Sequence, residues 1–83
     1  MKIHLRYFAS LREALGAEAV FEVPPGATVA ALRDALIATD ATHAQALTRS
    51  RTLRCALDQQ MCAEDAVLHD GAEVAFFPPV TGG

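Results

Sequence analysis

The end of the chain is the part whose residue types and order point to chemistry. The sequence finishes AEVAFFPPVTGG, so a pair of prolines precedes a short tail that stops at Gly82 and Gly83. Pro78 and Pro79 lack N–H groups and fix φ, so we expect them to end strand pairing and to hold the chain extended. Residues 80–83 would then reach roughly 13 Å further at ~3.3 Å per residue. Glycines at the tip have no side chain to collide with the walls of a narrow channel.

The only functional group at this tip is the α-carboxylate of Gly83. A carboxylate is a poor electrophile and must first be activated. ATP can convert it to an acyl-adenylate, whose AMP is then replaced by sulfur to give a thiocarboxylate, or by an amine to give an amide. The sequence has no Gly-x-x-x-x-Gly-Lys motif or other phosphate-binding loop. We therefore expect a partner enzyme to bind the ATP, and this chain to bind no cofactor.

Composition narrows the class of protein. The 83 residues suit one domain, and the net charge of −3 disfavours nucleic acid as the main partner. No stretch approaches the ~20 apolar residues of a membrane span. The N-terminus, MKIHLRYF, has no apolar signal core, so we expect a cytoplasmic protein that does not bind membranes.

The cysteines and histidines do not form a recognisable site. Cys55 and Cys62 are not a C-x-x-C pair, and no histidine stands at metal-ligand spacing from them. We expect both to be reduced packing residues. His4, His43 and His69 are scattered, and none has a Ser, Cys or carboxylate at catalytic spacing, so we expect no metal site and no catalytic histidine.

Alternating apolar and polar residues predict strands over residues 2–8, 18–23, 53–57, 60–62 and 73–77. Asp58-Gln59 and Asp70-Gly71 are the expected tight turns. In the last strand, Val74 and Phe76 should face one way, and Glu73, Ala75 and Phe77 the other.

Two short helical segments are predicted around the main helix. Residues 10–16 read as a helix that begins with a capping box of Ser10 and Glu13 and stops at Gly16. In residues 41–52, Thr42 and Gln45 fit the cap of a short helical turn.

The main helix is predicted over residues 28–40. Thr28 is a good N-cap, and Val29, Leu32 and Leu36 form an apolar stripe at helical spacing. Arg33 and Asp34 are expected to face water.

These elements predict a two-layer α+β domain, because the helices can bury their stripes only against one sheet face. A mixed four- or five-stranded sheet over one main helix is the β-grasp, or ubiquitin-like, architecture. A ferredoxin-like arrangement is the competing topology. We expect residues 1–79 to form the β-grasp domain and residues 80–83 a flexible tail.

Two aromatic residues are expected on the open face of this sheet. Phe8 lies on the polar side of the first strand, and Phe77 on the polar side of the last. In a β-grasp these strands are adjacent and parallel, so the rings would share the face that the main helix leaves open. An apolar patch there is a candidate partner surface. The alternative is that one ring packs under residues 58–70.

Two segments carry a resemblance to a known family. DGAEVAFFPPVTGG resembles the C-terminal signature of the small subunits of molybdopterin synthase, sulfur carriers of the MoaD type, and YFASLREALG resembles their first strand and helix. The similarity covers the whole chain and is weaker over residues 38–52. Asp58 departs from the pattern, where asparagine is expected, and both residues suit a turn.

The resemblance implies a function for the tail. A ubiquitin-activating-type enzyme would adenylate Gly83 with ATP, and a sulfur donor protein would convert the adenylate to a thiocarboxylate. The tail would then enter the large subunit, in a heterotetramer of two small and two large subunits, and pass its sulfur to cyclic pyranopterin monophosphate. The chain would be a non-catalytic carrier. Its reactive residues would be Gly82 and Gly83, and its partner interface Phe8, Arg12, Phe77, Pro78, Pro79, Val80 and Thr81, with Phe76 at or behind this surface and, by alternation, in the core. Arg12, on the small helix, could equally be a solvated charge.

Other functions fit the same tail. A sulfur carrier for the thiazole of thiamine is a near relative, against which FFPP argues. A protein modifier would join Gly83 to lysines, and a plain interaction module would leave the glycines idle.

Overall fold

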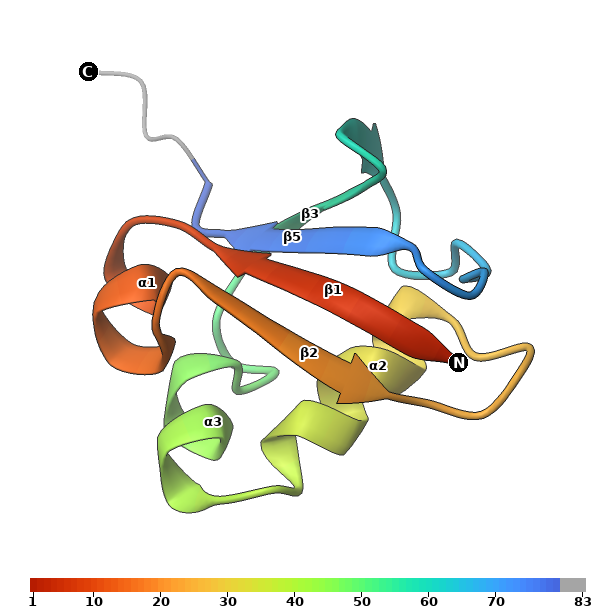
Figure 1. Ribbon diagram of the computed structural model, residues 1–83. Helices are drawn as coiled ribbons and strands as arrows, with labels where there is room; N and C mark the ends of the chain where they lie inside the picture. Colours follow the sequence, from red (N-terminus) through yellow and green to blue (C-terminus); the bar gives the residue numbers. More distant parts are fainter. Residues whose placement is uncertain (80–83) are drawn as a thin grey trace.

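The sheet order identifies the architecture. The computed structural model describes residues 1–79, so the predicted tail, residues 80–83, lies outside the described residues. The elements are β1 (Lys2–Tyr7), α1 (Ser10–Leu15), β2 (Glu18–Glu22), α2 (Val29–Ile37), α3 (Ala41–Ala46), β3 (Arg54–Leu57), β4 (Gln60–Cys62) and β5 (Glu73–Phe77) (Figure 1). They form one five-stranded sheet in the order β2-β1-β5-β3-β4. β1 and β5 run parallel and the other neighbours antiparallel, which confirms the predicted β-grasp.

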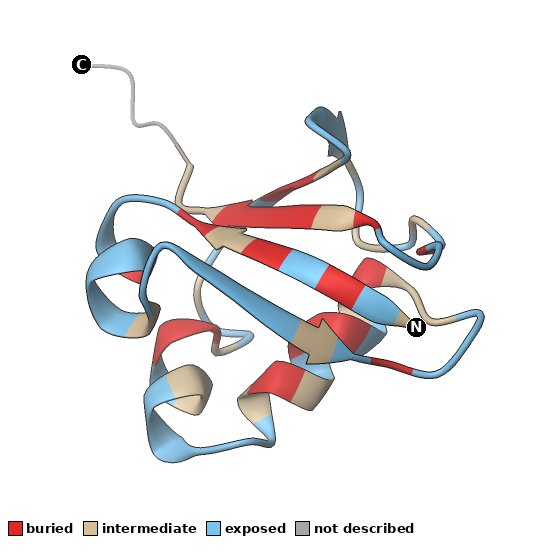
Figure 2. Ribbon diagram, viewed as in Figure 1, coloured by how far each residue is buried: buried red, intermediate tan, exposed pale blue. Residues whose placement is uncertain are grey.

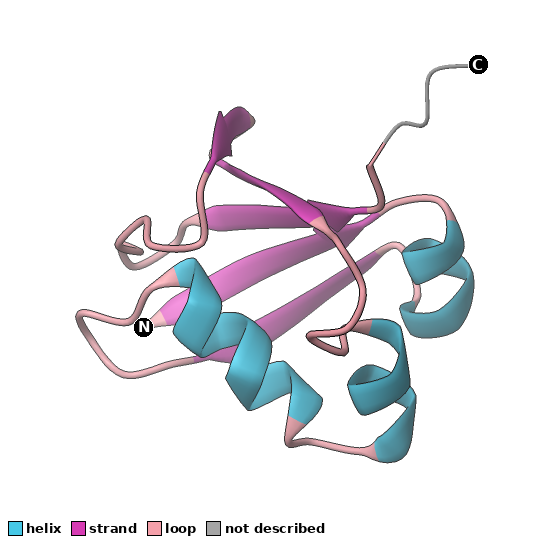
Figure 3. Cartoon of the chain, turned by 180° about the vertical axis from the view of Figure 1, so that it is seen from behind, coloured by secondary structure: helices cyan, strands magenta, loops and turns pink. Residues whose placement is uncertain are grey.

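The helices cover one face of the sheet (Figure 3). The core lies between α2 and the two central strands, and burial alternates along β1, as Figure 2 shows. Its members are Ile3, Leu5 and Tyr7 of β1, Val74 and Phe76 of β5, and Val29, Leu32 and Leu36 of α2. The strand period and the helical stripe therefore predicted the buried faces correctly.

The main helix ends earlier than predicted because a second helix begins close behind it. The predicted cap at Thr28 is confirmed, since its Oγ1 accepts from the N–H of Ala31 at 3.2 Å. α2 stops at Ile37, and Asp40 then caps α3 by accepting from the N–H of His43 at 2.8 Å. The short helix in this region is confirmed, but Thr42 as its cap was wrong. Asp40 takes that role two residues earlier.

The predicted capping box of α1 was also wrong. Ala9, at φ 54°, occupies the N-cap position, and Ser10 is already helical. Phe8 follows the last residue of β1, and the chain turns sharply at Ala9 to enter α1. The Phe8 carbonyl accepts from the N–H of Leu11 at 3.2 Å. Ser10 Oγ instead accepts from the guanidinium of Arg51 at 3.1 Å. The predicted stop at Gly16 is confirmed, with φ 91°.

Arg33 is buried, although the helical pattern placed it in water. Only 3% of it is exposed. Its guanidinium donates to the carbonyls of Leu47 at 2.8 Å, Thr48 at 2.7 Å and Arg51 at 3.1 Å. It also pairs with Glu64 at 2.8 Å. The chain after α3 folds back over α2, and its backbone carbonyls there are no longer hydrogen-bonded within a helix. The guanidinium of Arg33 donates hydrogen bonds to them. Asp34 is exposed, as predicted.

Arg33→Ala is expected to lower the free energy of unfolding by at least ~2 kcal/mol, because it leaves buried carbonyls without donors. Arg49→Ala is the matched control. Arg49 also contacts Glu64, and pairs with Asp34, but it is 45% exposed, so its loss should cost less than ~1 kcal/mol. Urea unfolding measures both values. Equal losses would contradict a special role for the buried guanidinium.

In the turn between β3 and β4, Asp58 stands where an asparagine was expected, and its carboxylate pairs with His69. Asp58 and Gln59 form the predicted turn, with φ of 50° and 68°. Asp58 Oδ1 accepts from the N–H of Glu73 at 3.0 Å, while Oδ2 lies 2.6 Å from His69 Nε2. An aspartate thus serves both partners where an asparagine has one acceptor oxygen. The hydrogen bond to Asp58 raises the pKa of His69, and the same bond lowers the pKa of Asp58.

The stabilisation from this pair should depend on pH. The contribution of His69 is present below its unfolded pKa of about 6.5 and is lost as pH rises through its raised folded pKa. The contribution of Asp58 is present above its unfolded pKa of about 3.9 and is lost as pH falls through its lowered folded pKa. The stability difference between wild type and Asp58→Asn should therefore peak between about pH 4 and 6.5. Urea unfolding across the pH range measures it, and a flat difference would contradict the prediction.

Candidate functional site

The two predicted surface aromatics meet at one corner of the sheet. β1 and β5 pair with Tyr7 opposite Phe76, so Phe8 and Phe77 come side by side as the strands end. Their ring centroids are 6.3 Å apart with the planes at 89°, an edge-to-face contact. Phe8 is 41% exposed and Phe77 half-buried. The prediction that both rings share the open face is confirmed.

These rings belong to a shallow apolar depression of about 370 Å³, lined by Phe8, Ala9, Phe77 and Pro78. We call these four residues the aromatic corner. Pro78 leaves β5 at this corner, and Pro79 follows it half-buried. Among described residues, the aromatic corner is thus the place from which the chain continues toward its end.

Phe76 points the opposite way from its neighbour Phe77. It is 1% exposed, and its ring stacks on Tyr7 with the centroids 6.4 Å apart. The strand alternation that assigned Phe76 to the core and Phe77 to the surface is confirmed. Of these two rings, Phe77 is therefore the one that is accessible from the surface.

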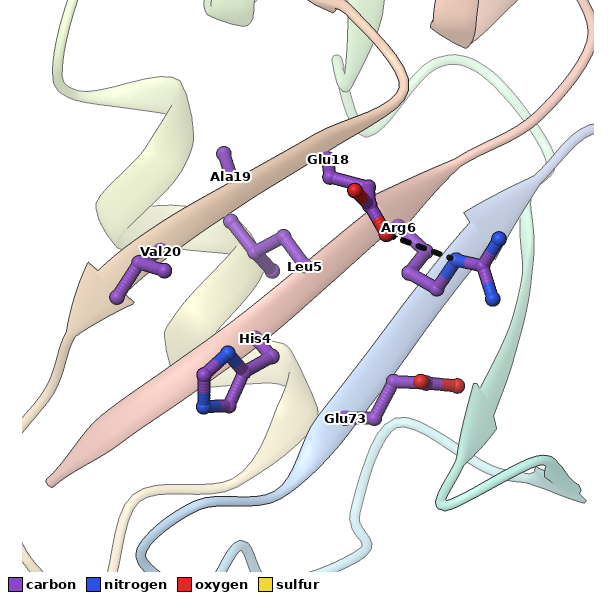
Figure 4. Close-up of a pocket in the computed structure, with 7 residues that line it drawn as sticks. All are labelled: His4, Leu5, Arg6, Glu18, Ala19, Val20 and Glu73. Atoms are coloured by element: carbon purple, nitrogen blue, oxygen red, sulfur yellow. Dashed lines mark ion pairs between the residues drawn. The ribbon is translucent and has the colours of Figure 1, made fainter.

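The other end of the open face is charged. Figure 4 shows His4 and Arg6 of β1, Glu18 and Val20 of β2 and Glu73 of β5 around a depression of about 460 Å³. Arg6 Nε lies 3.9 Å from Glu18 Oε1, and its guanidinium carbon lies 5.5 Å from the Phe8 ring centroid. Arg6 therefore joins the charged end to the aromatic corner through a cation–π contact.

Of the other predicted interface residues, Arg12 is exposed on α1, and its backbone nitrogen lies 3.4 Å from the Phe8 carbonyl oxygen. Val80, Thr81, Gly82 and Gly83 lie outside the described residues. The predictions missed Ala9 and Arg6. Arg6 had a usable signal, since it stands two residues before Phe8 on the same strand face.

The described part of the chain offers neither a metal site nor a membrane span. Within residues 1–79, no His, Cys, Asp or Glu side chains gather in a group of three that could hold a metal ion. In that same range, every helix is too short or too polar to cross a lipid bilayer.

Comparison with known proteins gives consistent matches over nearly the whole chain. The family model described as the ThiS family matches residues 5–83. The molybdopterin synthase sulfur carrier subunit of Escherichia coli (strain K12) is 42% identical over 81 residues, covering 98% of this chain and 99% of that protein. The crystal structure of small archaeal modifier protein 1 from Haloferax volcanii is 26% identical with a TM-score of 0.77, covering 95% of this chain and 98% of that one.

A third match lies within an assembly. It is a chain in the protein–protein complex of subunits 1 and 2 of the molybdopterin-converting factor from Helicobacter pylori. That chain is 20% identical with a TM-score of 0.68, and each chain is covered fully. At this identity the match shows the shared fold.

The opposite directions of Phe76 and Phe77 predict different effects of truncation. Phe76→Ala should lower the free energy of unfolding by ~3–5 kcal/mol, because it opens a cavity between the sheet and the helices. Phe77→Ala should cost only about 1 kcal/mol, mostly the lost contact with Phe8. Thermal or urea unfolding of the two variants tests this. A larger loss for Phe77→Ala would show that its ring is structural.

Proposed function

The chain belongs to the ThiS family, and from this premise we propose that it is the sulfur carrier subunit of a molybdopterin synthase. The full-length 42% identity to such a subunit carries the proposal. The aromatic corner supports it, because a partner surface lies beside the prolines that lead to the Gly-Gly end. The sequence FFPP before that end favours this carrier over the one for thiamine's thiazole.

The reactive atom of the carrier is the carboxyl carbon of Gly83. A ubiquitin-activating-type enzyme transfers AMP from ATP to the carboxylate and releases pyrophosphate. Sulfur from a donor protein then attacks the acyl-adenylate and expels AMP, which leaves a C-terminal thiocarboxylate. This chain supplies the carboxylate and the docking surface, and the partners supply ATP binding and the sulfur.

The open face is the docking surface for the large subunit. The aromatic corner offers desolvatable apolar area, and Arg6, Glu18 and Glu73 offer charges for orientation. Docking there directs the prolines and the following glycines toward the active site of the large subunit. The thiocarboxylate then passes its sulfur to cyclic pyranopterin monophosphate. The Helicobacter pylori assembly is a precedent for such pairing by a chain of this fold.

A protein modifier is the second candidate function. The observation that favours it is the match to small archaeal modifier protein 1. An amine in place of sulfur would displace AMP and join Gly83 to a lysine. Mass spectrometry of the protein from its own host separates the two: exchange of oxygen for sulfur at the terminus supports carriage, and lysine adducts support modification.

Deleting Gly82 and Gly83 should abolish sulfur transfer and leave thermal stability nearly unchanged. The reactive carboxyl would be displaced from the reach of its partners, whereas within residues 1–79 the last member of the buried core is Phe76. A reconstituted molybdopterin synthase assay and a melting curve measure the two effects. Full activity of the shortened chain would overturn the proposed function.

Phe77→Ala should weaken binding to the large subunit by more than ~1 kcal/mol, because it removes an aromatic anchor from the docking surface. Val67→Ala is the matched control, since Val67 is an apolar residue that is 64% exposed and pairs with Thr28 at the start of α2. Titration calorimetry with a cognate large subunit measures both. Binding unchanged in both variants would remove the aromatic corner from the interface.

A further inference from the structure

The two cysteines lie directly opposite each other on the β3–β4 hairpin. Cys55 and Cys62 are partners in the antiparallel register, and their Sγ atoms are 3.7 Å apart. Both are free thiols. Antiparallel partners have Cα atoms about 4.5–5.5 Å apart, which lies within the ~4.4–6.8 Å range of disulfides. Rotation of the side chains, without separation of the strands, can therefore bring the sulfurs together.

We propose that Cys55 and Cys62 form a dithiol modification site, which a hydroperoxide closes into an intramolecular disulfide across the β3–β4 hairpin. This site is separate from the proposed sulfur-carrying terminus. Neither cysteine lines the aromatic corner or the charged depression of the open face.

The surroundings of the two thiols set the order of the reaction. Both cysteines line a depression of about 350 Å³ together with Met61 and Glu64, and Cys62, on the edge strand β4, is only half-buried there. Cys55 is 4% exposed, and its thiol donates to the Cys62 carbonyl at 3.3 Å. Burial raises the pKa of Cys55 to about 12, so its sulfur stays protonated. The peroxide therefore meets Cys62 first.

The two thiols are then oxidised to a disulfide in two steps. The Cys62 sulfur attacks the peroxide O–O bond, which gives a sulfenic acid at Cys62 and releases the alcohol, or water from hydrogen peroxide. The Cys55 thiol then gives its proton to the departing hydroxyl of the sulfenic acid as its sulfur attacks the Cys62 sulfur, so that the S–S bond forms, the S–O bond breaks and water leaves. The dithiol loses two electrons and the peroxide gains them. The sulfurs approach by about 1.7 Å to reach a disulfide bond length of ~2.04 Å.

The hairpin can accommodate this approach. β4 has only three residues and is an edge strand, paired in the described sheet with β3 alone. An edge of this kind moves more freely than the central strands. β3, by contrast, is held against β5, with Cys55 opposite Phe76. The sulfur of Cys62 therefore moves toward that of Cys55, which keeps its position.

The full chain, reduced and freed of reductant, is treated with hydrogen peroxide and then with N-ethylmaleimide, and its intact mass is measured. We expect the monomer to lose two hydrogen atoms and to take up no maleimide. Dithiothreitol should restore both alkylatable thiols. A monomer that gains oxygen while one thiol stays alkylatable, or one that forms only intermolecular dimers, would overturn the proposal.

Single variants keep the test decisive. Cys55→Ala should form a sulfenic acid at Cys62 that a dimedone reagent traps, whereas wild type should yield little trapped product because Cys55 resolves it. Cys62→Ala should react slowly with hydrogen peroxide and with N-ethylmaleimide, since its remaining thiol, Cys55, is buried. Equal dimedone labelling of wild type and Cys55→Ala would show that Cys55 does not resolve the sulfenic acid, and so would contradict the proposal even if one variant folds poorly.

Discussion

The parallel pairing of β1 with β5 is the constraint on which the other features depend. It joins strands from the two ends of the chain at the centre of the sheet, so that the inward residues of both contact α2. Because parallel strands end at the same edge, Phe8 and Phe77 emerge together, and Pro78 departs beside them. The core and the proposed docking surface are opposite faces of this one pairing. A shift of register by one residue would exchange them.

Arg33 shows how the helical layer closes without a large apolar surface. The chain after α3 has carbonyls that no helix or strand satisfies, and one buried guanidinium serves three of them. Glu64, from the segment that follows β4, balances the charge and is only partly exposed. A single side chain thus links α2, the segment after α3 and the segment after β4. An apolar residue there would pack but would leave the carbonyls unsatisfied.

The sequence could predict the features that depend on the spacing of apolar residues along a single strand or helix. Alternation along the strands separated Phe76 from Phe77, and the β-grasp order then brought Phe8 to Phe77. The failures at Ser10 and Arg33 have another cause, which is the contribution of partners far along the chain, whereas Thr42 lost the α3 cap to its near neighbour Asp40. Ser10 did not cap α1, because the chain turns sharply at Ala9 and the Ser10 hydroxyl accepts a hydrogen bond from Arg51 instead. Arg33 has an ordinary position on the exposed side of the pattern, and only the return of residues 47–51 makes that position an interior one.

The composition of the aromatic corner suits the chemistry proposed for the chain end. An acyl-adenylate reacts with any nucleophile in reach, so a carrier gains by keeping thiols, hydroxyls and amines away from the place where its tail begins. Phe8, Ala9, Phe77 and Pro78 carry none of these groups. The thiol of Cys55 is close in the sheet, one strand away from Phe76, yet it is buried and its pKa is raised to about 12 by that burial. The hydrophobic surface proposed to bind a partner therefore also offers no nucleophile of its own to the proposed acyl-adenylate.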